Sequence, residues 1–86
     1  MTKREFKIIK ALLGVLHNLD GAQIAEAVLH AEVNLHVTPT ASLAEFDGAV
    51  TVADANRWVV VVQSKFGSGR KFTLSDAGEA ALLEMR

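Results

Sequence analysis

Apolar residues recur at helical spacing near the start of the chain and predict a first helix from about Thr2 to Leu19. One stripe consists of Phe6, Ile9, Leu13 and Leu16, and a second stripe beside it consists of Ile8, Leu12, Val15 and Leu19. Together the two stripes cover about half of the helix circumference, more than the ~100° stripe that a surface helix needs. We therefore expect the second stripe to lie in a partner interface, with a homodimer as the simplest arrangement.

Two further helices are predicted between residues 22 and 56. The second runs from about Ala22 to Ala31, and its expected inward residues are Ile24, Ala27, Val28 and Ala31. Alternation in the following segment, residues 32–38, suggests a short extended stretch before Pro39. The third helix begins at Ser42, which forms a capping box with Glu45, and ends near Asn56. Its expected buried stripe is Leu43, Phe46, Val50 and Ala53, and a close helix crossing is our explanation for Gly48 in its middle.

The residue pattern after the third helix predicts a β-hairpin and a final helix. The β-branched run after Trp58 favours a strand over residues 58–63. The segment "KFGSG" turns the chain, and Arg70 to Leu74 return as the partner strand. Ser75 then caps a last helix, in which Ala77, Ala80, Ala81, Leu82 and Leu83 are the expected packing residues. The sequence thus predicts one α+β, mostly helical domain over residues 1–86: three helices, a hairpin wing and a C-terminal helix.

This order of elements resembles that of the winged helix superfamily. The run "RKFTLSDAGEAAL" is similar to the junction between wing and final helix in that superfamily, and "ANRWVVVV" lies where the third helix leads into the first wing strand. The resemblance covers nearly the whole chain and implies a transcriptional regulator that binds DNA. In that case, the third helix would enter the major groove and the hairpin would follow the backbone. The segment from Glu32 to Ala41 is longer than the tight turn of a helix-turn-helix.

Composition limits the possible environments and functions. Nine basic and ten acidic residues give a formal charge of -1, whereas a dedicated nucleic-acid binder is usually basic. The chain contains no cysteine, which excludes a disulfide framework and fits a reducing cytoplasm. No segment approaches the roughly 20 apolar residues that span a bilayer. We therefore expect a cytoplasmic protein that has no contact with a membrane.

The expected DNA contacts are basic residues of the hairpin and of the first helix: Lys65, Arg70, Lys71, Lys3, Arg4, Lys7 and Lys10. The third helix disfavours DNA binding, because its outer face carries Glu45, Asp47 and Asp54 and no cation before Arg57. Our first interpretation is a protein of the transcriptional-regulator type that binds DNA weakly and with tolerance of sequence, through the basic wing and the first helix. The alternative is an adaptor module that binds protein and no DNA. The charge of the third helix favours the adaptor.

No residue pattern indicates catalysis or a cofactor. His17, His30 and His36 match no metal-ligand spacing. Trp58 directly precedes four valines, so core packing explains it better than ligand stacking does. No serine has a base at a recognisable spacing. We therefore expect neither an enzyme nor a bound metal or cofactor.

Overall fold

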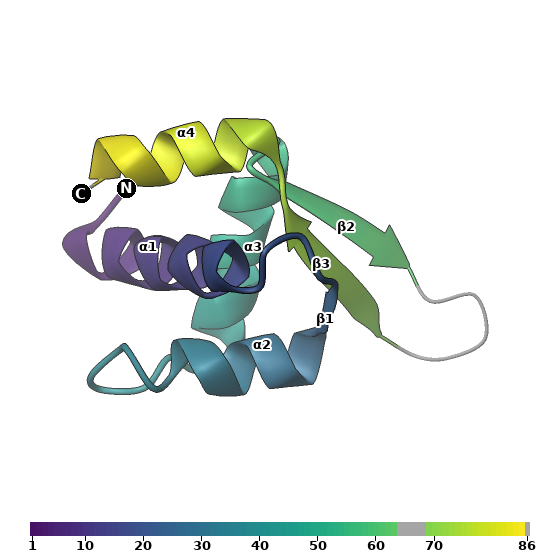
Figure 1. Ribbon diagram of the computed structural model, residues 1–86. Coiled ribbons are helices and arrows are strands. Elements are labelled where there is room, and N and C mark those ends of the chain that lie inside the picture. The colour runs from purple at the N-terminus through teal and green to yellow at the C-terminus, as the bar shows by residue number, and fades with distance from the viewer. Residues whose placement is uncertain (64–68, 86) are drawn as a thin grey trace.

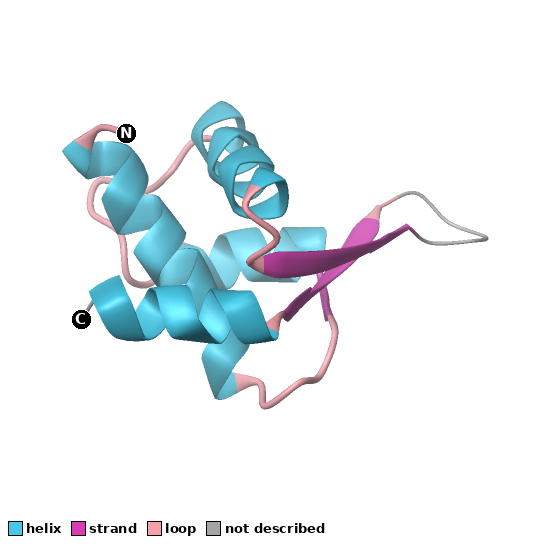
Figure 2. Ribbon diagram, turned by 90° about the horizontal axis from the view of Figure 1, so that it is seen from above, coloured by secondary structure: helices cyan, strands magenta, loops and turns pink. Residues whose placement is uncertain are grey.

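The computed structural model describes residues 1–63 and 69–85. In chain order its elements are α1 (Lys3–Asn18), β1 (Ile24–Ala25), α2 (Glu26–Val33), α3 (Leu43–Ala55), β2 (Val59–Gln63), β3 (Arg70–Leu74) and α4 (Asp76–Met85) (Figure 1). The strands form one antiparallel sheet in the order β1-β3-β2. The helices gather at one end, and the β2–β3 hairpin extends away from them (Figure 2). The expected α+β, mostly helical class is confirmed.

Helix α1 lies at the centre of the fold and packs against α2, α3 and α4. Both of its apolar stripes enter the core of this one chain: Ile9, Leu13 and Leu16 from the first, and Ile8, Leu12 and Val15 from the second are all buried. Phe6, the remaining residue of the first stripe, is 38% exposed. Leu19 is partly buried against the same core. The second stripe is therefore not an exposed interface, and its assignment to a dimer contact was wrong. A helix with neighbours on three sides needs apolar residues on three sides.

The second helix begins later than predicted and buries a different face. Ile24 and Ala25 form strand β1, in which Ile24 lies opposite Phe72 and Ala25 opposite Lys71 of β3. Helix α2 then starts at Glu26 and buries Leu29 and Val33. The predicted inward residues Ala27 and Ala31 are exposed, and so is Val28. Pairing with the distant strand β3 extends residues 24–25, and this shifts the start of the helix.

The segment between α2 and α3 is a loop and not the suggested extended stretch. Side chains of α2 and of its C-cap residue, Asn34, hold this loop. The side chain of Asn34 accepts a hydrogen bond from the Ala41 N–H at 2.7 Å and donates one to the Ala41 carbonyl oxygen at 3.3 Å. His30 Nε2 lies 2.8 Å from the same carbonyl oxygen, and its ring stacks on Phe46 at 4.7 Å between centroids. Ala41 is buried, so these polar side chains fix the loop just before α3.

The start of α3 confirms the predicted capping box, with Ser42 as the N-cap and Asn56 as the C-cap. Phe46, Val50 and Ala53 are buried as expected, whereas Leu43 is 60% exposed. Gly48 does not mark a helix crossing, because an added Cβ there would have nothing within 4 Å. The helix therefore tolerates Gly48 without needing it for packing.

The β2–β3 hairpin leads through Ser75 into the final helix, α4. In the hairpin, Val59 lies opposite Leu74 and Gln63 opposite Arg70. Ser75 Oγ accepts a hydrogen bond from the Gly78 N–H at 3.0 Å, which confirms the predicted cap. Of the expected packing residues in α4, Leu82 is buried and Ala81 partly so, whereas Ala77, Ala80 and Leu83 are exposed. Among the described helices, none combines the length and the apolar character required to cross a membrane.

Candidate functional site

Arg70 is the centre of an ion-pair cluster that joins the hairpin to two helices. Its guanidinium donates a short hydrogen bond to Glu26 at the start of α2 and lies 3.6 Å from an Asp47 carboxylate oxygen on α3. It also lies over the Phe72 ring, 5.4 Å from the centroid. The bond to Glu26, followed by the charges of Asp47 and Asp54, raises the pKa of Arg70 above its ordinary value. We call Arg70, Glu26 and Asp47 the Arg70 cluster.

The exposed face of α3 is acidic. Asp47 and Asp54 are seven residues apart, which places them two turns apart on the same side of the helix, and both are exposed. Arg70 is the cation beside them: it is bonded to Glu26 and lies 3.6 Å from Asp47, so one positive charge faces two carboxylates and the Arg70 cluster keeps a net negative charge. The remaining exposed residues of this helix are small, apolar or hydroxyl-bearing: Leu43, Ala44, Gly48, Thr51 and Ala55. This face therefore presents negative charge with no basic group of its own.

Arg4 binds the N-terminal end of α3. Its guanidinium donates to both carboxylate oxygens of Glu45, at 2.9 and 3.3 Å, and to the Thr40 carbonyl oxygen at 3.1 Å. Glu45 also accepts a hydrogen bond from the Ser42 N–H as part of the capping box. The Arg4 bond and then the Ser42 bond lower the pKa of Glu45 to about 2. Arg4 therefore stabilises the N-terminus of α3 within the chain, and its expected role as a DNA contact does not fit this geometry.

We expect the Glu45 carboxylate to make the free energy of unfolding depend on acid pH. A carboxyl whose pKa is lowered by folding stabilises the protein above its unfolded pKa of 4.5, and that contribution is lost as the pH falls towards about 2. In Glu45→Gln, the amide keeps the capping-box acceptor but cannot titrate. Urea denaturation at several pH values should show the wild type more stable at pH 7, with the difference closing between pH 4.5 and 2. A constant difference across that range would contradict the assignment.

Among the residues that the structure describes, the basic side chains expected at a DNA interface do not converge on one surface. Arg70 and Arg4 are held in the ion pairs described above, which leaves Lys71 exposed on β3 and Lys3, Lys7 and Lys10 exposed on α1. Lys71 borders a hollow that it shares with Asp47 and Arg70, whereas the α1 lysines line different hollows. Lys65 lies outside the described residues. The sequence could have separated Arg70 from Lys71, since neighbouring strand residues point to opposite faces.

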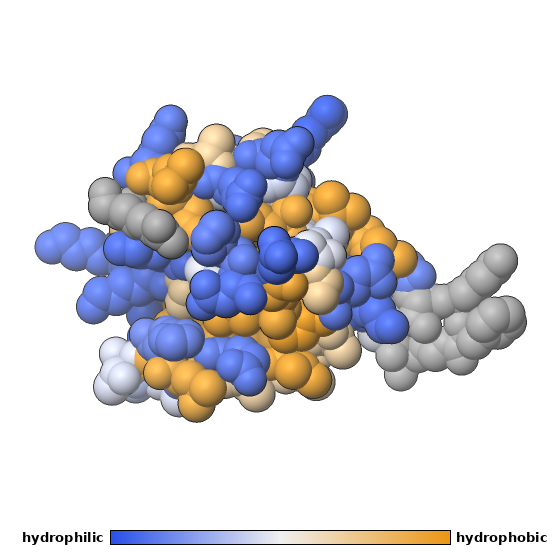
Figure 3. Space-filling model, in the orientation of Figure 1, coloured by the Kyte–Doolittle hydropathy of each residue, from blue (hydrophilic) through white to orange (hydrophobic). Residues whose placement is uncertain are grey.

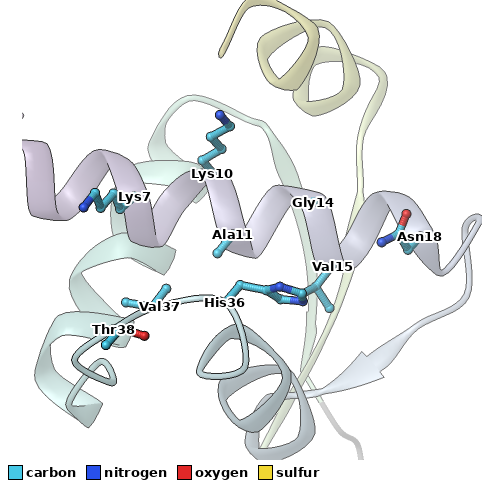
Figure 4. Close-up of a pocket in the computed structure, with 9 residues that line it drawn as sticks. All are labelled: Lys7, Lys10, Ala11, Gly14, Val15, Asn18, His36, Val37 and Thr38. Carbon is cyan, nitrogen blue, oxygen red and sulfur yellow. The ribbon is translucent and has the colours of Figure 1, made fainter. Parts of the chain in front are cut away.

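An open groove that sequence reasoning missed runs beside the α1 lysines. Lys7 and Lys10 line it on α1, and His36 and Thr38 line it on the facing segment (Figure 4). Its volume is about 550 Å³, and Gly14 leaves part of its wall bare, since an added Cβ there would meet nothing within 4 Å. The lysine spacing at residues 3, 7 and 10 is the signal that could have revealed this basic edge.

The three histidines lie in separate surroundings. His17 is paired with Glu79 of α4 at 3.2 Å, His30 contacts the loop before α3, and His36 lines the groove. Within residues 1–63 and 69–85, no cluster of three potential metal ligands occurs. Trp58 packs against the core as a partly buried side chain, in agreement with the packing interpretation.

Comparison with family models, with curated proteins and with solved structures finds no match to this chain. The charged surfaces of the described chain are an acidic face on α3, a basic row on α1 and two arginines held in ion pairs.

Proposed function

We propose that this chain is a winged helix-like adaptor module that binds a basic protein surface through the acidic face of α3. Support for the winged helix-like fold comes from the order of the elements, in which three helices precede the β2–β3 hairpin and a final helix follows it. The junction through Ser75 and Gly78 adds to this support, because it has the hydroxyl cap and the glycine of the similar wing-to-helix junctions.

The charge of α3 is the observation that carries the proposal. DNA presents a dense row of phosphates, and Asp47 and Asp54 would be repelled by it. Base edges are read mainly by Arg, Lys, Asn and Gln, and the exposed face of α3 holds none of these. A protein partner with lysine or arginine residues would instead complement the two carboxylates. Leu43, 60% exposed at the start of the helix, offers an apolar anchor beside them.

DNA binding is the second candidate, and the exposed lysines favour it. Lys3, Lys7 and Lys10 form a basic row on α1, and each phosphate contact would make binding weaker as salt rises. Such binding would be tolerant of sequence, because a lysine row contacts the backbone and not the bases. It would use a surface different from the acidic face of α3.

A synthetic helical peptide with leucine and lysine on one face, and a random-sequence DNA duplex, serve as the two probes. The adaptor proposal expects the peptide to bind, with Asp47→Asn plus Asp54→Asn raising its Kd about tenfold, roughly 0.7 kcal/mol for each lost charge pair. Glu32→Gln plus Glu84→Gln is the matched control, since it removes the same charge from exposed sites on α2 and α4, and should leave the Kd nearly unchanged. Fluorescence anisotropy measures both probes.

The same titrations can overturn the proposal in two ways. Equal loss of peptide binding in both double variants would mean that overall charge, and not the face of α3, attracts the peptide. Salt-sensitive DNA binding that is lost when Lys3, Lys7 and Lys10 become alanine, together with no peptide binding, would establish the second candidate instead.

A further inference from the structure

Strand β2 forms an open edge of the sheet. The order β1-β3-β2 leaves it paired on one side only. The Ser75 N–H donates to the Trp58 carbonyl oxygen at 3.1 Å, which makes these two residues a hydrogen-bonded pair. Since such pairs alternate along an antiparallel ladder, Val60 and Val62 direct their backbone groups towards β3. Val59, Val61 and Gln63 therefore direct their N–H and C=O groups outward, and none of them has a hydrogen-bond partner elsewhere in the described chain.

This edge lacks the features that normally protect an edge strand. Natural edges are kept from pairing by charged side chains, proline, bulges or very short length. Strand β2 spans five residues, four of them valine, and contains neither a charge nor a proline. Val60 and Val62 are 47% and 39% exposed on the outer face of the sheet. Hydrophobic atoms, drawn in orange, lie along the β2 edge of the hairpin in the space-filling view, beside hydrophilic atoms in blue (Figure 3). The part of β2 that is open to a further strand runs from Val60 to Gln63, since Val59 is buried.

We propose that β2 pairs antiparallel with β2 of a second copy of this chain, on a two-fold axis that passes through Val61. The outward-directed residues are symmetric about Val61, so Val61 would face its own copy and Val59 would face Gln63 of the second copy. Each of these pairs exchanges two backbone hydrogen bonds. In the same register, Val60 lies opposite Val62 of the second copy, and the outer valines form one apolar cluster across the axis.

We assign the partner of the β2 edge to a second copy of the chain, because β2 can pair with an identical strand without charge repulsion. An uncharged strand pairs with its own copy without repulsion, whereas a charged one would require an opposite partner. The formal charge of the whole chain, -1, adds little repulsion between copies. A register centred on Val61 also uses every outward backbone group of β2, and a shift by one residue would place outward groups opposite groups already bonded to β3. A homodimer thus remains our expectation, with β2 in place of the α1 stripe as the interface.

Sedimentation equilibrium from micromolar to millimolar concentration tests the dimer. Val60→Lys plus Val62→Lys places like charges opposite each other across the axis and should raise the dimer Kd about a hundredfold, from two lost valine pairs and two repulsive ones. Both side chains are exposed, so the single chain should keep its fold, which circular dichroism verifies. Val28→Lys is the matched control, because Val28 is 51% exposed on α2, and should leave the dimer Kd unchanged.

Amide hydrogen exchange distinguishes strand pairing from other self-association. The N–H groups of Val61 and Gln63 should become protected as the protein concentration rises, whereas those of Val60 and Val62, which are bonded to β3, and of Val59, which is buried, should be protected at every concentration. A monomer across the whole range would overturn the proposal. A dimer that survives the lysine variant, with exchange at Val61 independent of concentration, would overturn it as well.

Discussion

Replacing Gly78 with alanine should lower the free energy of unfolding by about 3 kcal/mol, the upper part of the usual range for forcing atoms into a packed site. An added Cβ would lie 2.0 Å from the Trp58 carbonyl oxygen and 2.6 Å from Leu74 Cδ1. The first contact is with backbone, so no side-chain rotation can relieve it. Helix α4 would have to move away from the start of β2 and weaken the Ser75 cap. The urea midpoint of the variant gives the measurement.

Gly48→Ala is the matched control for this substitution. It is the same chemical change in another helix, at a position where nothing lies within 4 Å of the added Cβ. Alanine is favoured over glycine in a helix interior by up to about 1 kcal/mol, so this variant should be more stable than the wild type. Opposite signs for the two variants would confirm that close packing, and not helix propensity, determines the effect at Gly78. An unchanged midpoint for Gly78→Ala would show that α4 is not held against Trp58.

Asn34→Ala should destabilise the protein by about 2 kcal/mol. The variant leaves the buried Ala41 N–H without its acceptor, and an unsatisfied buried donor costs about 1–3 kcal/mol. His30 still contacts the Ala41 carbonyl oxygen, so the expected loss concerns the donor. Asn18→Ala is a suitable control, because Asn18 is exposed at the end of α1, and should change the stability by less than about 0.5 kcal/mol. Equal midpoints for the two variants would mean that water replaces Asn34 at Ala41.

The features predicted correctly from the sequence are those encoded by neighbouring residues. Ser42 and Glu45 form a capping box across three residues, and Ser75 caps α4 in the same local way. The valine run and its partner strand follow from β propensity, whereas the predicted turn "KFGSG" falls mostly outside the described residues. In each case the interacting groups are close together in the chain, so a short stretch of sequence contains all of the necessary information.

The features that were missed depend on residues far apart in the chain. Ile24 and Ala25 become a strand only because Phe72 and Lys71 come to lie beside them. The second stripe of α1 suggested a partner, since the sequence of one helix does not reveal how many others surround it. Arg4 and Arg70 resembled exposed phosphate ligands, yet Glu45 lies 41 positions from Arg4 in the chain and Glu26 lies 44 positions from Arg70. Candidate site residues were therefore less predictable than helices and strands.

The two-residue strand β1 also affects the order in which the domain folds. Helices α1 and α2 can begin to pack as neighbouring segments, and β2 and β3 are adjacent strands in chain order. Joining Ile24 to Phe72 instead closes a loop of more than half of the chain, and the entropy cost of closure grows with loop length. Contacts of this kind slow folding. We therefore expect the pairing of β1 with β3 to form late, when the helices and the hairpin have already brought the two segments together.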